Sequence, residues 1–257
     1  MATNFIKIGD HVIKMVYESE KVFFLKNEVQ FRNVTKQIDL EITIIHEFST
    51  PFTDYNVQIT KEPTKITYRR SDYLIEVDPE YKEATLYVHD ELALKHAFMN
   101  LYSSFINYHN WGLLVHSSCV IENGRAHIFS GQSGAGKSTA AKLSHPRELL
   151  SDEASILKVT DQEVTVYNSP FNSELDSSDL ASAPLASIQL LHQSLQNRKE
   201  SISKSDAFIH LIDKVFYWEH SDEETRRILH MLQQLVETVP VYNLHFQKNN
   251  SFWELIS

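Results

Sequence analysis

The chain has 257 residues, of which 42% are hydrophobic, and a formal net charge of -10. This length accommodates one large domain or a small domain followed by a medium one, and the apolar content excludes a wholly disordered chain. The acidic balance, without any run of Lys or Arg, argues against a nucleic-acid-binding protein, because such proteins present a cationic surface to phosphates. The single cysteine, Cys119, excludes an internal disulfide and favours a reducing compartment.

Hydrophobic segments of the kind that direct a chain to a membrane are not found in the sequence. Residues 1–17 lack the apolar core and cleavage site of a signal peptide, and nowhere do eighteen apolar residues run together. We therefore expect a soluble, cytoplasmic protein with neither nucleic acid nor membrane as a partner. The sequence leaves the oligomeric state open, including a homo-oligomer.

Residues 1–90 alternate mostly with period two between apolar and polar side chains. The runs richest in β-branched and aromatic residues are Val22–Leu25, Ile38–Ile45 and Thr85–Val88. Proline-containing turn signals separate such runs, so the pattern predicts an antiparallel β layer of about six strands. The layer has no motif that indicates chemistry, and we interpret His46, Asp54 and Glu76 as surface or strand-end residues rather than ligands.

A helix is predicted next, over Glu91–Asn110, because large apolar residues recur there at helical spacing. We interpret residues 91–112 as a connecting helix between the β layer and a module formed by residues 113–257. The module begins with a predicted strand over Leu113–Ile121, which turns back at Glu122–Gly124 into a second strand over Ala126–Ser130.

The motif on which the functional argument depends follows that second strand and fits the pattern G-x-x-x-x-G-K-[ST]. Its residues are Gly131, Gln132, Ser133, Gly134, Ala135, Gly136, Lys137, Ser138 and Thr139. Glycines let the backbone turn its N–H groups toward a phosphate, Lys137 would reach the β- and γ-phosphates, and the Ser138 hydroxyl would bind Mg²⁺. The predicted helix over Lys137–Leu143 adds its positive N-terminal end to anion binding. The motif predicts a nucleotide-binding site.

Further elements are predicted beyond the loop. These are strands at Leu149–Leu150, Ile156–Val159, Val164–Tyr167, Ile188–His192 and Val239–Phe246, helices at Ser203–Glu219 and Asp222–Thr238, and a helical stub at Phe252–Ile256. The polar segment Asn168–Asp179 is either a lid that closes over the substrate or a solvated loop. The pair Arg226-Arg227 either contacts a phosphate or forms ordinary helix-surface contacts, and is not named as catalytic.

Phosphoryl transfer also needs an acid for Mg²⁺ and, when the acceptor is an alcohol, a base beside its hydroxyl. One candidate is Asp213, which ends the run Phe208–Ile212, but this run has helical spacing and favours a solvated helix residue. The other candidate is the pair Asp152-Glu153, which closely follows the helix after the loop. Adjacent carboxylates at a strand end could divide metal binding from proton acceptance, or could form an ordinary charged turn.

Together His116, the Gly131–Thr139 loop and Asp152-Glu153 resemble the catalytic domain of HPr serine kinase/phosphorylase, a member of the phosphoenolpyruvate-carboxykinase-like nucleotide folds. The resemblance implies an α/β protein whose N-terminal β layer precedes a carboxykinase-like P-loop module. It also implies that Asp152 takes the proton of the acceptor serine, that Glu153 assists at Mg²⁺, and that His116 positions the phosphoryl group. The residues alone favour a strand histidine satisfied in the core at His116, and the resemblance reverses that preference.

The resemblance is clear over residues 113–170 and looser elsewhere. The second Asp of the family's pair is Glu153 here, and the β-rich N-terminal region differs from that of true HPr kinases. The whole chain is more similar to the shortened kinase homologues encoded beside lasso-peptide biosynthetic genes, with counterparts of Pro170–Glu174 and Val239–Tyr242. Those homologues phosphorylate a serine hydroxyl at the C-terminal end of the precursor peptide.

We therefore expect an ATP- and Mg²⁺-dependent serine kinase, acting on a peptide such as a lasso-peptide precursor. Two alternatives stay open. The acceptor could be a folded carrier protein of the HPr type or a small molecule. Alternatively, the protein could be a non-catalytic nucleotide-binding sensor or assembly factor, although mere binding would not need the carboxylate pair.

Overall fold

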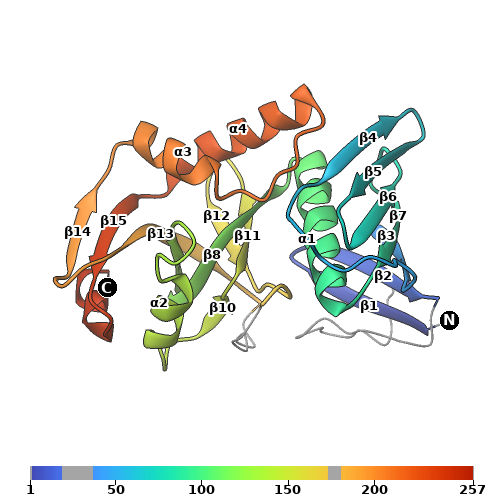
Figure 1. The fold of residues 1–257 in the computed structure, drawn as a ribbon. Coiled ribbons are helices and arrows are strands. Elements are labelled where there is room, and N and C mark those ends of the chain that lie inside the picture. Colours follow the sequence, from blue (N-terminus) through green and yellow to red (C-terminus); the bar gives the residue numbers. More distant parts are fainter. Residues whose placement is uncertain (1, 19–36, 173–180, 257) are drawn as a thin grey trace. The chain divides into compact units, whose positions relative to one another are not determined.

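The computed structural model describes residues 2–18, 37–172 and 181–256. The chain divides into two compact units, which are described separately (Figure 1). The N-terminal unit comprises Met1–His109 and Tyr217–Thr225, and the C-terminal unit comprises Asn110–Phe216 and Arg226–Ser257. The predicted strand at Val22–Leu25 lies outside the described residues.

The described residues of the N-terminal unit form a seven-stranded sheet with one long helix against it. Its elements are β1 (Ala2–Ile8), β2 (His11–Tyr17), β3 (Leu40–Ile45), β4 (Gln58–Glu62), β5 (Lys65–Arg69), β6 (Tyr73–Val77), β7 (Glu83–Val88) and α1 (Glu91–Tyr108). The order across the sheet is β1-β2-β3-β7-β6-β5-β4. Asp90 caps α1 by accepting a hydrogen bond from the Ala93 amide through its side chain.

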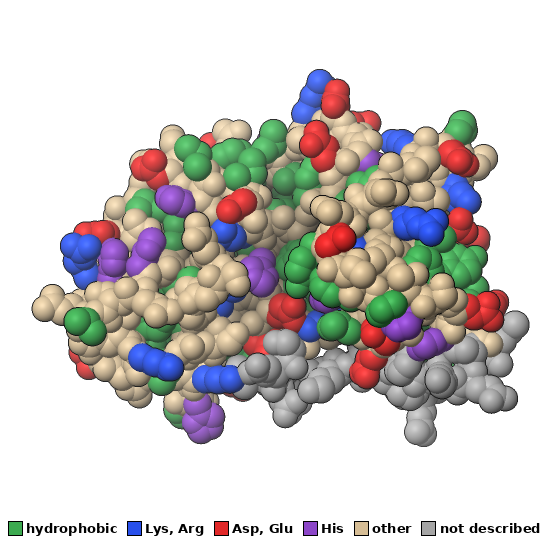
Figure 2. Space-filling view, in the orientation of Figure 1, with side chains coloured by type: hydrophobic (Ala, Val, Ile, Leu, Met, Phe, Trp, Pro, Cys, Tyr) green, Lys and Arg blue, Asp and Glu red, His purple; other side chains and the backbone are tan. Residues whose placement is uncertain are grey.

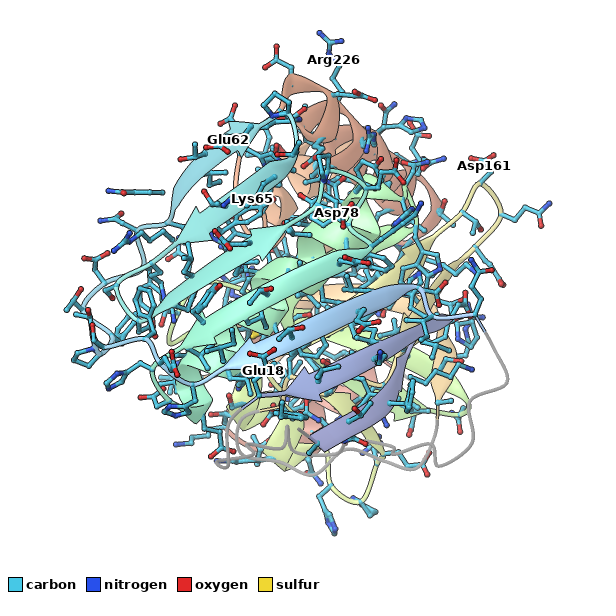
Figure 3. The ribbon with its side chains drawn as sticks, turned by 90° about the vertical axis from the view of Figure 1, so that its right-hand side faces the viewer. Glu18, Glu62, Lys65, Asp78, Asp161 and Arg226 are labelled. Atoms are coloured by element: carbon cyan, nitrogen blue, oxygen red, sulfur yellow. The ribbon has the colours of Figure 1, made fainter. Side chains whose placement is uncertain are left out.

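Period-two alternation makes one face of this sheet apolar. Along β3 the burial alternates strictly, and the buried side chains of β6 and β7 face the helix side, where Phe98, Leu101 and Phe105 of α1 are buried. The other face is polar and has the ion pairs Lys14–Glu41 and Lys65–Glu76. Figure 3 looks onto this polar face, with Glu62 and Lys65 labelled at the β4–β5 turn.

The prediction that this layer is antiparallel was wrong for its centre. Strand β3 pairs in parallel with both β2 and β7, whereas the other neighbouring strands are antiparallel. The long connection between β2 and β3 permits a crossover, and the chain forms β4, β5 and β6 before β7 returns beside β3. The alternation of apolar and polar residues indicates which face of a sheet each side chain occupies. It does not indicate whether the neighbouring strand runs parallel or antiparallel.

The segment Tyr217–Thr225 joins this unit from late in the sequence. The hydroxyls of Tyr68 and Tyr81, both fully buried, lie 2.6 Å apart. Beside them His220 Nε2 lies 3.0 Å from Glu224 Oε2, close enough for an ion pair although outside hydrogen-bond alignment. Burial raises the pKa of both tyrosines, so both hydroxyls stay protonated and available as donors.

The C-terminal unit contains the predicted nucleotide module. Its strands are β8 (Gly112–Glu122), β9 (Arg125–Ser130), β10 (Leu149–Ser151), β11 (Ala154–Val159), β12 (Val164–Tyr167), β13 (Ser182–Gln193), β14 (Arg198–Ser201) and β15 (Val241–Phe246). Its helices are α2 (Lys137–Leu143), α3 (Lys204–Ile212), α4 (Asp222–Thr238, which begins in the other unit) and the 3-10 helix η1 (Asn250–Leu255).

Five of these strands close on themselves. Strand β8 pairs with β11, β11 with β12, β12 with β13, β13 with β9, and β9 again with β8, which gives a barrel-like sheet. Strand β10 extends it beside β8, while β15 and then β14 extend it beside β13. Because β9 lies between β8 and β13, the loop that follows β9 emerges between two firmly paired strands.

The helix predicted over Ser203–Glu219 is shorter in the structure and ends at Ile212, with Asp213 as its C-cap. Beyond that cap, Val215 forms a bridge with Val115 of β8, and the Phe216 amide donates to the Leu114 carbonyl at 2.9 Å. Pairing with an exposed strand edge replaces the helical hydrogen bonds over these residues. Apolar spacing alone therefore overestimated the helix by about two turns.

No helix among the described residues is both long and apolar enough to span a bilayer. The longest, α1, carries charged and polar residues along its length.

Candidate nucleotide-binding and phosphoryl-transfer site

The loop of the G-x-x-x-x-G-K-[ST] motif connects β9 to α2. Gly136 adopts φ 109° at the N-cap of α2, a conformation that L-residues rarely take. A Cβ at this position would lie 2.7 Å from Phe246 Cζ. Both the backbone angle and the close ring therefore require glycine, as the motif predicts.

Lys137 is the buried cation of the loop, with 8% of its surface exposed. Its Nζ donates to the carbonyls of Gly131 and Gln132 at 3.1 and 3.2 Å, so the ammonium lies within the curve of the loop. Ser118 of β8 donates to the Lys137 carbonyl at 3.0 Å and ties the start of α2 to the sheet. Burial first, and the charge of Lys214 second, lower the pKa of Lys137.

A cavity of about 400 Å³ brings together most of the predicted site residues. It is lined by His116, Ser133, Gly134, Gly136, Lys137, Ser138, Thr139, Asp152, Glu153 and Gln193. Three predicted loop residues, Gly131, Gln132 and Ala135, line a neighbouring cavity of about 520 Å³ together with Ser133 and Gly134. The loop thus forms a wall shared by both cavities.

Asp152 and Glu153 lie in the turn between β10 and β11. Asp152 is 3% exposed, and its amide donates to Asn172 Oδ1 at 3.0 Å. The Glu153 carbonyl accepts a hydrogen bond from the Ser117 amide at 3.1 Å. These contacts fix the backbone of the carboxylate pair relative to β8.

Three buried serines lie around this turn and hold the strands that position it. Ser155 Oγ is 2.7 Å from Ser117 Oγ and 2.5 Å from Ser151 Oγ, which links β11 to β8 and β10. Ser117 also donates to the Val115 carbonyl. Since buried hydroxyls need partners, this chain of serines restrains the spacing of the three strands beneath the carboxylates.

His116 lies in the middle of β8, where the pairing of that strand passes from β11 to β9. Its amide donates to the Lys214 carbonyl at 2.7 Å, and its ring packs edge-on against Phe216 with centroids 5.7 Å apart. Burial, followed by the charges of Lys137 and Lys214, lowers the pKa of His116 to about 4. The imidazole is therefore neutral near pH 7 and can position a phosphoryl oxygen without adding a charge.

The donors in this cavity fit Mg²⁺ that arrives with a nucleotide. Mg²⁺ in such sites usually takes one or two protein carboxylates and completes its shell with phosphate oxygens and water. The Ser138 hydroxyl and the carboxylates of Asp152 and Glu153 line the same cavity. Among the described residues no cluster of three or more His, Cys, Asp or Glu side chains is placed to hold a metal alone.

Two site residues were not identified from the sequence. Lys214 lines the 520 Å³ cavity and acts electrostatically on both Lys137 and His116. Asn172 is 4% exposed, and its Oδ1 accepts a hydrogen bond from the Asp152 amide. The sequence indicates this residue only as a member of the Pro170–Glu174 stretch. Neither residue has a fixed spacing from the loop motif that could have indicated its place.

The remaining candidates lie outside the 400 Å³ cavity, although Asp213 lines the 520 Å³ cavity. Asp213 caps α3, and its carboxylate pairs with Lys214 at 2.6 Å instead of lying with Ser138. Cys119 is fully buried, and burial raises the pKa of its thiol, as expected for an inert cysteine. Arg226 and Arg227 line neither cavity. Residues 173–179 of the predicted lid lie outside the described residues.

Histidines gather on the face of this unit formed by α3 and strands β13–β15 (Figure 2). His192 and His245 stack with centroids 4.9 Å apart, and His192 and His210 border the 520 Å³ cavity. Gln193, beside this group, donates to the Gly134 carbonyl at 2.8 Å and thereby fastens the tip of the loop to the end of β13.

The search of curated proteins found no match. Among solved structures, the chain is similar to the Hpr(Ser) kinase/phosphatase from Coxiella burnetii at 10% sequence identity, over 55% of this chain and 90% of that chain, with a TM-score of 0.30. The likeness is distant and partial.

A family comparison reaches further along the sequence. The family described as SynChlorMet cassette protein ScmC matches residues 80–257, which include β7, α1, and the whole loop region with its carboxylate pair. The match covers more than half of the chain. The chain therefore belongs to the SynChlorMet cassette protein ScmC family.

Proposed function

We propose that this protein is an ATP- and Mg²⁺-dependent kinase that transfers the γ-phosphoryl group to a serine hydroxyl of a peptide. The observation that carries the proposal is one cavity lined by Lys137 and Ser138 of the loop and by Asp152. Nucleotide binding alone needs the loop and its cation. Transfer to a hydroxyl needs, in addition, a proton acceptor beside the phosphates, and a nearly buried aspartate meets that need.

In the proposed reaction the serine oxygen bonds to the γ-phosphorus, the bond from that phosphorus to the β,γ-bridging oxygen breaks, and ADP leaves. Asp152 accepts the hydroxyl proton. Lys137 offsets the charge of the phosphates, and neutral His116 orients the transferring group. Ser138 and Glu153 would hold Mg²⁺, which when bound would offset the charge that develops on the phosphate oxygens.

The acceptor that we propose is the C-terminal serine of a lasso-peptide precursor. Its support is the similarity of Pro170–Glu174 and Val239–Tyr242 to kinase homologues that act on such peptides. Asn172 within the first of these stretches holds the Asp152 amide at 3.0 Å, which links the resemblance to the proposed base. A folded HPr-type protein and a small alcohol are the competing acceptors.

The first experiment is intact-mass analysis of acceptors incubated with the protein, ATP and Mg²⁺. We expect a gain of one phosphate on a peptide that ends in serine, and no gain when that serine is alanine. Lys137→Ala should abolish the gain by weakening ATP binding. Asp152→Asn should retain ATP binding and lose transfer by at least about a hundredfold, the usual contribution of general base catalysis.

The outcomes separate the alternatives. Transfer to an HPr-type protein or a small alcohol, but to no peptide, would support the proposed kinase activity and reject a peptide as its acceptor. ATP binding without transfer to any acceptor would favour a nucleotide-binding sensor or assembly factor. Full transfer by Asp152→Asn would reject this residue as the base.

A further inference from the structure

A second lysine, Lys214, is built into the wall of the nucleotide loop. The main chain on both sides of it is fixed to β8, since the Lys214 carbonyl accepts from the His116 amide at 2.7 Å and Val215 bridges to Val115. The position of this lysine is therefore set by the same strand that positions His116. Its side chain does not depend on a flexible loop for its location.

The side chain itself is already ordered and largely buried. It is 11% exposed, and Nζ lies 2.6 Å from Asp213 Oδ2, whereas the Asp213 side chain is 63% exposed. Lys214 lines the 520 Å³ cavity together with Gly131–Ala135 of the loop. Because burial already limits the rotamers of this side chain, turning to an anion costs it less entropy than it would cost an exposed lysine.

Lysines line the cavities on both sides of the loop, with Asp152 and Glu153 beside Lys137 in one wall and Asp213 beside Lys214 in the other. Lys137 lies inside the loop and Lys214 close enough to lower the pKa of both Lys137 and His116. The carboxylate nearest Lys214 is the mostly exposed Asp213. Two lysines facing one loop repel each other, and an anion between them relieves that repulsion.

We propose that Lys214 is a second phosphate-binding residue, which turns from Asp213 to the terminal phosphate of the bound nucleotide. This inference rests on the proposed function. Asp213 is then the resting counter-ion of Lys214. The cavity beside the Gly131–Ala135 side of the loop gives the ammonium room to turn. The 2.7 Å hydrogen bond from the His116 amide to the Lys214 carbonyl places this residue near the group that is transferred rather than the nucleoside.

The test compares the binding of ATP and ADP, each with Mg²⁺, by calorimetry. Lys214→Met should weaken ATP binding about tenfold while changing ADP binding little, because a charge-assisted contact to the terminal phosphate is lost. Lys214→Arg should restore most of the ATP preference. Asp213→Asn should tighten ATP binding severalfold by releasing Lys214, and this gain should vanish in the Asp213→Asn, Lys214→Met double variant.

The matched control is Lys204→Met, which removes an equal charge from the exposed first turn of α3 and should leave both affinities unchanged. Equal ATP affinities for the wild type and Lys214→Met would overturn the inference, as would equal losses for ATP and ADP. If Lys214→Met does not fold, an unaltered ATP affinity in Asp213→Asn would overturn it instead. A wild-type protein that binds neither nucleotide would refute the proposed function, and this inference with it.

Discussion

At the scale of single residues, burial of titratable groups is the feature with the clearest consequences. His127 of β9 is 7% exposed, its Nδ1 lies 2.9 Å from Ser187 Oγ, and its ring meets Trp253 edge-on. Burial, the largest cause, lowers the pKa of His127 from 6.5 to about 4. Between these two values the unfolded chain binds a proton at this position that the folded chain does not.

This difference predicts a pH-dependent stability. The part of the unfolding free energy that depends on a neutral His127 is fully present above pH 6.5. It is lost as the pH falls toward 4, by about 3 kcal/mol at most. His127→Gln should therefore flatten the fall in the free energy of unfolding across that window, measured by urea denaturation at several pH values. Replacement of the exposed His230 is the control. If the free energy of unfolding of His127→Gln fell as steeply with pH as that of the wild type, this histidine would not be the source of the pH dependence.

The sequence revealed the site residues to different extents. The loop, Lys137 and Ser138 could be predicted because phosphate binding demands glycines and a lysine at fixed spacing. The Asp152-Glu153 pair was a candidate from its position after the loop, with an ordinary charged turn as the alternative, and the family resemblance gave these residues and His116 their roles. Lys214 could not be predicted, because it reaches the loop through an unusual pairing of Val215 with β8. Its neighbour Asp213 was interpreted as a metal ligand or a solvated helix residue, and is the partner of Lys214.

At the scale of elements, the loop depends on β15 beneath it. Phe246, at the end of β15, is 3% exposed and belongs to the apolar cluster under α2, with Phe129, Phe252 and Trp253. Its ring occupies the space that a side chain at Gly136 would need. The Trp253 indole donates to Ser144 Oγ at 2.9 Å, so η1 closes this cluster over the end of α2.

Gly136→Ala should therefore lower the free energy of unfolding by more than backbone strain alone would. We expect a loss of about 2–4 kcal/mol from strain at positive φ and from displacement of Phe246, with loss of ATP binding. Gly124→Ala is a matched control, because Gly124 has φ 75° and open space around its Cβ position. Gly124→Ala should lose only about 1 kcal/mol of unfolding free energy. Equal losses of unfolding free energy in urea would argue against a steric role for Phe246.

Element types were easier to predict than their connections. The α2 and α4 helices, the β8–β9 hairpin and the β11–β12 hairpin follow the predicted boundaries closely, because local periodicity and turn residues determine them. The parallel pairing of β3 and the closed ring of five strands depend on contacts between distant segments. No local pattern encodes those contacts.

At the scale of the whole molecule, the chain passes between its two units three times, after His109, Phe216 and Thr225. The C-terminal unit therefore cannot be separated from the other by a single cut. A chain that lacks residues 1–109 retains Tyr217–Thr225 but no longer contains Tyr68 and Tyr81. The hydroxyls of these two tyrosines lie beside His220 in the full chain.

We expect chymotrypsin to cleave that shortened chain rapidly within Tyr217–Thr225, because the buried His220–Glu224 pair becomes exposed. The full chain should resist cleavage at these positions under the same conditions. Mass spectrometry of early fragments identifies the sites. Equal protection of the two chains would mean that the segment folds without its tyrosine partners.

The same path through the two units determines the order in which the ribosome can complete them. The seven strands of the N-terminal sheet and α1 emerge first, yet the segment that accompanies Tyr68 and Tyr81 is synthesised only after α3. Since synthesis adds about 5–20 residues per second, the unit waits on the order of ten seconds for its last part. The nucleotide loop and its carboxylate pair are synthesised during that interval, because they lie between residues 109 and 217. Neither unit can therefore be finished before the other is nearly complete.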